Sequence, residues 1–104
     1  MSTFEDRQKG FENKFAYDEE MTFKINARRN KLFGLWAAEK LGKTGDEAEV
    51  YAKDVVMAEF ESDGDVVEKV LKDFEKSGIS IGSKQLYAEL EYLLPVAREQ
   101  VMNS

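Results

Sequence analysis

The sequence predicts an all-α fold, an antiparallel four-helix bundle with a long first helix and a flexible N-terminal arm. Apolar residues recur at helical spacing in four segments, at about residues 19–41, 45–61, 65–77 and 83–101. Short turns that contain glycine separate these segments, and such turns place successive helices side by side. The 104 residues are enough for one hydrophobic core. We therefore expect one domain over 19–104, preceded by an arm over 1–18.

Composition excludes several classes of function. The chain has no cysteine and no histidine, which removes the thiol nucleophile, the disulfide, and the commonest general base and metal ligand. Its carboxylates fall on the polar faces of the expected helices, so nothing indicates a desolvated catalytic pair. We expect no enzyme and no metal site. The charged start and the lack of a long apolar run predict a cytoplasmic protein without membrane insertion.

The first helix is organised around residues 27–42, which read ARRNKLFGLWAAEKLG. The first half of this segment is basic, and its second half is apolar on almost every side, as in a helix that is buried among others. Gly42 supplies the left-handed residue that ends the helix. Gly34 lies in the interior, where glycine costs up to ~1 kcal/mol relative to alanine. Close approach of another helix at Gly34 would compensate for that cost.

The later helices each begin at a predicted cap. Thr44 with Glu47 and Asp65 with Glu68 form capping boxes, and Ser83 caps the last helix. Their apolar stripes predict the inward-facing side chains, which are Ala48, Tyr51, Ala52, Val55, Val56, Phe60, Val67, Val70, Leu71, Phe74, Leu86, Leu90, Leu93, Leu94, Ala97 and Val101. These helices would therefore pack against the first helix.

Three short stretches need separate interpretation. Gly-Lys-Thr at 42–44 resembles the end of a phosphate-binding loop, but the glycine needed five positions earlier is Ala37, inside a helix. We interpret this tripeptide as a helix boundary. Residues 78–82 alternate like a strand without a partner, so we expect a loop whose isoleucines fill the core. Pro95 predicts that the last helix bends or ends there.

Cations gather in the middle of an acidic chain. Residues 21–45 hold six Lys and Arg against one Glu, whereas the whole chain has a net charge of −6. We name four of them the basic cluster: Lys24, Arg28, Arg29 and Lys31. A phosphate-bearing ligand would suit this cluster, and salt links to Asp and Glu of the third and fourth helices are the alternative. No cofactor is required, and the acidic remainder argues against nucleic acid as a partner.

The N-terminal arm carries an aromatic period. Phe4, Phe11 and Phe15 recur at i, i+7 and i+11, which aligns them on one helical face. Gly10 interrupts this segment and its capping signals are poor, so we expect an arm that is disordered or partly helical when free. Either the arm becomes helical when its phenylalanine face enters a partner's groove, or the phenylalanines dock on the chain's own core.

The run FAYDEEMTFKINARRNKLFGLWAAEKLG, at 15–42, resembles the DUF1476 family. This family is the zeta subunit that inhibits the F1 ATPase of alphaproteobacterial ATP synthases. The similarity continues through GDEAEVYAK at 45–53 and DVVMAEF at 54–60, and it covers most of the chain. The resemblance implies a four-helix bundle. It also implies attachment to the inner membrane through F1, with its alpha, beta and gamma subunits as partners.

The resemblance also implies a mechanism. Similar proteins insert the N-terminal arm at a catalytic alpha/beta interface near gamma and block rotation in the hydrolytic direction. The matching residues of this arm are Phe4, Arg7, Phe11, Lys14 and Phe15. Weak ATP or ADP binding is also associated with the family, and we assign it to the basic cluster. The alternative is a small helical protein that binds adenine nucleotide, or a scaffold or homodimer, without inhibition of F1.

Overall fold

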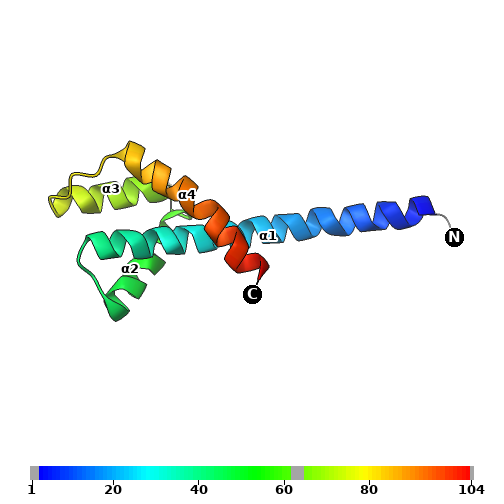
Figure 1. The fold of residues 1–104 in the computed structure, drawn as a ribbon, viewed down its shortest axis with the longest axis horizontal. Helices are drawn as coiled ribbons and strands as arrows, with labels where there is room; N and C mark the ends of the chain where they lie inside the picture. Colours follow the sequence, from blue (N-terminus) through cyan, green and yellow to red (C-terminus); the bar gives the residue numbers. More distant parts are fainter. Residues whose placement is uncertain (1–2, 62–64, 104) are drawn as a thin grey trace.

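The structure is a computed structural model that describes residues 3–61 and 65–103, with side chains from residue 19 onward. The described residues form four helices and no strand (Figure 1). The helices are α1 (Thr3–Lys40), α2 (Gly45–Ala58), α3 (Val66–Lys76) and α4 (Ser83–Met102). The predicted all-α, four-helix fold is therefore confirmed.

The first helix is much longer than the others. Its 38 residues would span ~57 Å, which is most of the 65 Å length of the molecule. The other three helices gather around its C-terminal half, and its N-terminal half extends beyond them (Figure 1). We expected the first helix to begin near residue 19, whereas α1 begins at Thr3 and includes most of the predicted arm. The division of the chain into an arm and a bundle stays a prediction.

Helix α1 packs mainly between α2 and α4 and has a smaller contact with α3. Gly34 lies where α1 and α2 meet. A Cβ atom at Gly34 would lie 2.7 Å from the Cα of Ala52 and 3.1 Å from the Cβ of Val55. The predicted close approach of another helix at Gly34 is therefore confirmed.

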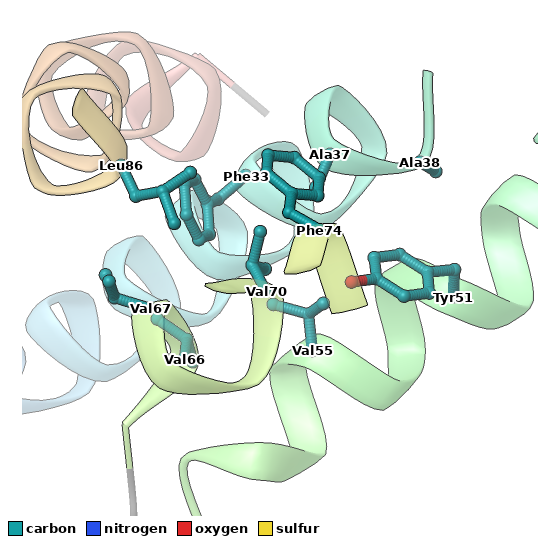
Figure 2. Close-up of a cluster of buried hydrophobic side chains, with 10 residues drawn as sticks. All are labelled: Phe33, Ala37, Ala38, Tyr51, Val55, Val66, Val67, Val70, Phe74 and Leu86. Carbon is teal, nitrogen blue, oxygen red and sulfur yellow. The ribbon is translucent and has the colours of Figure 1, made fainter. Parts of the chain in front are cut away.

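The core lies where all four helices converge (Figure 2). Phe33 of α1, Phe74 of α3 and Leu86 of α4 are fully buried in it. Trp36 packs against Phe33 and Phe74, with ring centroids 5.8 and 6.1 Å apart. The isoleucines of the loop before α4, Ile79 and Ile81, are partly buried against this core, as predicted. Side chains of all four helices therefore build this core.

Several predicted helix boundaries are confirmed. Gly42, the predicted end of the first helix, has a left-handed backbone angle, with φ of 79°, two residues after α1. Gly78 has φ of 72° at the same place after α3. Gly42-Lys43-Thr44 joins two helices, as the interpretation of this tripeptide requires. The carboxylate of Asp65 accepts hydrogen bonds from the backbone N–H groups of Val67 and Glu68, at 2.9 and 3.4 Å. Asp65 is therefore the N-cap of α3.

One predicted cap lacks its side-chain hydrogen bond, and another lies one residue away from the predicted position. Thr44 is the N-cap residue of α2, but its side chain makes no capping hydrogen bond. Gly45, the next residue, has a φ of +57°, so the first turn lacks the regular geometry that aims amides at the cap side chain. Gly82, not Ser83, is the N-cap of α4, because its carbonyl accepts the hydrogen bond from Leu86 N–H at 3.1 Å.

The two caps give a matched pair of predictions. We expect Asp65→Ala to lower the free energy of unfolding by about 1 kcal/mol, because two amide donors of α3 and the hydroxyl of Tyr87 lose their acceptor. Thr44→Ala should change it by a few tenths of a kcal/mol at most, since no side-chain bond is lost. Urea unfolding followed by circular dichroism measures both. If the two variants lost equal free energy of unfolding, the assignment of Asp65 as the hydrogen-bonding cap would be contradicted.

Helix α2 is shorter than expected, whereas α4 has the expected extent. Helix α2 ends at Ala58 because the amides of residues 59–61 bond to carbonyls only three residues earlier. Phe60, predicted to face inward, is consequently exposed. Helix α4 continues through Pro95 from Ser83 to Met102, so it does not end there.

Candidate partner-binding surface

The basic cluster does not form a single site. The guanidinium of Arg29 donates from Nε and Nη2 to the Oδ1 of Asn30, at 3.3 and 3.2 Å. Lys24 borders a separate depression with Glu19, Glu20 and Phe23. Only Arg28 and Lys31 line the same groove. The four cations therefore have three different surroundings.

The groove lies between α1 and α2 and has a volume of about 410 Å³. Arg28, Lys31 and Lys53 provide its charged rim, and its remaining lining is apolar: Ala27, Val56 and Met57. The Nη1 of Arg28 also donates to the Oε1 of Gln100 on α4, at 3.2 Å. The groove thus combines basic and apolar side chains.

The alternative expectation, that the basic cluster forms salt bridges with the third and fourth helices, names the wrong helices. Among the described residues, the ion pair of the cluster joins Lys31 Nζ to Glu49 Oε2 of α2, at 3.8 Å. The α4 partner of Arg28 is Gln100, which is neutral. Helix α2 lies along the basic half of α1, so the carboxylate opposite Lys31 comes from α2.

Asn30 is a polar residue of this region that the sequence analysis missed. It is fully buried, and its Nδ2 donates to Glu59 Oε2 at 2.9 Å. Arg29, Asn30 and Glu59 thus form a hydrogen-bonded chain that ties α1 to the end of α2. One signal was present in the sequence. Asn30 precedes Gly34 by one helical turn and therefore shares the face that meets α2.

A second polar cluster joins α2 to α3. The hydroxyl of Tyr51 donates to Asp73 Oδ2 at 2.7 Å, and Lys69 Nζ donates to the same oxygen at 2.9 Å. Burial raises the pKa of Tyr51 above its ordinary value, and the hydrogen bond to Asp73 raises it further. Burial alone would raise the pKa of Asp73, but the bonds from Tyr51 and Lys69 outweigh it and lower that pKa. A phenol held in its protonated form is a hydrogen-bond donor at neutral pH, so this cluster fastens two helices.

Asp73 should make stability depend on pH. Because its pKa is lower in the folded state, its contribution is complete well above the ordinary pKa of 3.8 and is lost progressively as the pH falls from there through the folded value. We expect Asp73→Asn to cost about 1–3 kcal/mol at pH 7, with a smaller difference from the unchanged chain near pH 2. Urea unfolding at each pH measures this. Glu75→Gln, an exposed change on α3, is the control. A difference for Asp73→Asn that is constant with pH would contradict the assignment.

The comparisons with known proteins identify the family. The family model described as ATPase inhibitor subunit zeta matches residues 1–100. The chain belongs to the zeta family of ATPase inhibitor subunits. This confirms the resemblance found at residues 15–60.

A solved structure is similar to this zeta-family chain in both fold and sequence. A protein whose structure was determined in solution by NMR is 47% identical to it, with a TM-score of 0.69. The match covers 80% of this chain and 96% of that protein. No curated protein matches the chain.

The residues predicted as the inhibitory arm of this zeta-family chain all lie in α1. They are Phe4, Arg7, Phe11, Lys14 and Phe15. Their side chains lie outside the described part of the structure, so their roles stay predictions. Of the basic cluster, to which ATP or ADP binding was assigned, only Arg28 and Lys31 line the same groove. Nucleotide binding also stays a prediction.

Two further observations on the zeta-family chain concern metal sites and membrane-spanning helices. Among the side chains that the structure describes, those of residues 19–61 and 65–103, no group of three or more Asp and Glu is placed to hold a metal ion. None of the four helices is both long enough and apolar enough to span a membrane, within the residues described.

Proposed function

We propose that this chain inhibits ATP hydrolysis by the F1 part of ATP synthase, with residues 1–18 as the inhibitory element. The observation that carries this proposal is the projection of α1. Its N-terminal half extends beyond the packing of α2, α3 and α4 as a continuous helix (Figure 1). Membership of a family described as an ATPase inhibitor subunit supports it. A projecting helix on a packed bundle suits a protein that inserts one element into a partner.

The proposed block is steric and needs no chemistry from this chain. Residues 3–18 would form a helix ~24 Å long, which enters a catalytic alpha/beta interface near gamma and prevents rotation in the hydrolytic direction. Phe4, Phe11 and Phe15 provide aromatic anchors on one face, and buried anchors of this kind typically contribute ~2 kcal/mol or more each. Arg7 and Lys14 provide positive charge between them.

The bundle would hold this arm in place. Residues 3–18 continue a helix whose C-terminal half is packed in the core of the bundle. Binding of these residues therefore costs less conformational entropy than binding of a free peptide. In this proposal the alpha, beta and gamma subunits of F1 are the partners. The chain would then be a non-catalytic cytoplasmic subunit, peripheral to the inner membrane through F1.

Titration of the purified chain into cognate F1 tests the proposal. We expect ATP hydrolysis to fall to a plateau near one chain per F1, and the chain to co-elute with alpha, beta and gamma on gel filtration. Tyr92→Ser, a change at an exposed residue of α4, should inhibit equally and serves as the control. Unchanged hydrolysis at a large excess of chain, without co-elution, would refute this function.

No observation favours nucleotide binding as a second function. The cations expected to hold the phosphates are separated: Arg29 is bonded to Asn30 and Lys24 borders another depression. Weak ATP or ADP binding remains a prediction, which amide shift mapping with millimolar ADP would test.

A further inference from the structure

We propose that the groove between α1 and α2 and the aromatic pair beside it form a second docking site, which takes an acidic segment with an apolar face from the inhibited ATPase. This inference rests on the proposed function and adds a contact outside the arm. We name the surface the α1–α2 patch and define it as Phe23, Arg28, Lys31, Lys53, Met57 and Phe60.

The apolar part of the α1–α2 patch is exposed. Phe23, Met57 and Phe60 are 61%, 58% and 60% exposed, and the rings of the two phenylalanines lie 6.4 Å apart. Phe23 lies one turn from Ala27, and Phe60 one turn from Met57, so the pair lies beside the groove. Phe23 also lines the neighbouring depression, with Glu19, Glu20 and Lys24. Aromatic residues and methionine are enriched at the cores of protein interfaces. The patch therefore has the composition of a contact surface.

The charge of the patch indicates what covers it. The groove is lined by three cations and no carboxylate, although the chain as a whole has a net charge of −6. Lys31 is held by Glu49 only at 3.8 Å, and both side chains are about half exposed, so Lys31 can exchange this partner for another carboxylate. An acidic segment complements this rim. A nucleotide in the groove would leave Phe23 and Phe60 uncovered, whereas a helix with an apolar face covers both.

The position of the patch indicates that the partner is the protein that holds the arm. Phe23 and Arg28 follow residue 18 by one to three turns of the same helix, or roughly 8–15 Å along its axis. A protein that encloses residues 3–18 therefore has its surface close to the patch. Two contacts on one rigid helix strengthen each other, because binding of the first raises the effective concentration of the second.

Charge reversal in the full-length chain tests the docking site. The double variant Arg28→Glu/Lys53→Glu removes the complementary charge, and Met57→Ser/Phe60→Ser removes the exposed apolar contacts. We expect the dissociation constant for cognate F1 to rise at least tenfold in each, while inhibition at saturation stays complete because the arm is intact. The effect of the charge variant should shrink at high salt. Lys72→Glu/Lys84→Glu, at exposed cations of α3 and α4, should change the constant less than twofold.

The outcomes separate this inference from the proposed function. If the patch variants bind F1 as tightly as the unchanged chain, and arm variants lose inhibition, the docking site is refuted and the inhibitory function stands. If the unchanged chain does not bind F1, both are refuted. If millimolar ADP shifts the amide signals of Arg28 and Lys53 and the patch variants alter only ADP binding, the groove is a nucleotide site. Thermal unfolding of each variant verifies that the fold is unchanged.

Discussion

Gly34→Ala is expected to destabilise the bundle by about 2–3 kcal/mol, which lowers the melting temperature by roughly 10–20 °C. The added methyl group would lie 2.7 Å from the Cα of Ala52, which is backbone and cannot move without displacing α2. Helix propensity alone predicts the opposite sign, a gain of up to ~1 kcal/mol for alanine in a helix interior. The sign of the change therefore distinguishes close packing of α1 on α2 from a local propensity effect. Thermal and urea unfolding of the two chains measure it.

Gly82→Ala is the matched control for this change. Gly82 has a φ of −87°, which any residue adopts, and a Cβ there would meet no atom within 4 Å. We expect a change below about 1 kcal/mol, from the lower preference for alanine at an N-cap. If Gly34→Ala were as stable as the unchanged chain, α1 and α2 would not be in the contact described.

Replacement of Phe4, Phe11 and Phe15 by serine is expected to abolish inhibition of F1 at concentrations where the unchanged chain inhibits fully. At ~2 kcal/mol for each anchor, the loss of two alone would weaken binding about a thousandfold. ATP hydrolysis by F1, titrated with each chain, measures this. Tyr92→Ser, at an exposed aromatic residue of α4, is the control and should inhibit as the unchanged chain does.

The melting temperature of the phenylalanine variant separates the two interpretations of the arm. If the three residues act only in the partner's groove, the bundle of the variant unfolds at the same temperature as that of the unchanged chain. If they dock on the chain's own core, the variant loses the burial of three aromatic side chains and its melting temperature falls. Full inhibition by a chain with three serines would remove the phenylalanine face from the mechanism.

The sequence predicts the helices well because their signals are local. Apolar periodicity, the glycine after α1 and the N-cap of α3 depend only on nearby residues, and Gly42 and Asp65 have the predicted roles. Gly34 was also interpreted correctly, because a glycine inside a strong helix has few explanations other than close packing. These residues were sufficient to predict four helices around one core.

Sequence reasoning failed where the answer depended on another helix. The exposure of Phe60 follows from the end of α2 at Ala58, which is decided by backbone bonds that no residue type specifies. The burial of Asn30 depends on the position of Glu59. The basic cluster appeared to be one site because its members are close in sequence, yet neighbouring helical residues point in different directions. Arg28 shares its groove with Lys53, a residue of α2.

The most direct test of the account is ATP hydrolysis by cognate F1 in the presence of a chain that begins at Glu19, compared with the full chain. Circular dichroism first establishes that the shortened chain unfolds at the same temperature. The account predicts that the full chain reduces hydrolysis to a plateau and that the shortened chain, at a hundredfold higher concentration, leaves it unchanged. Equal inhibition by the two chains would show that residues 1–18 are not the inhibitory element.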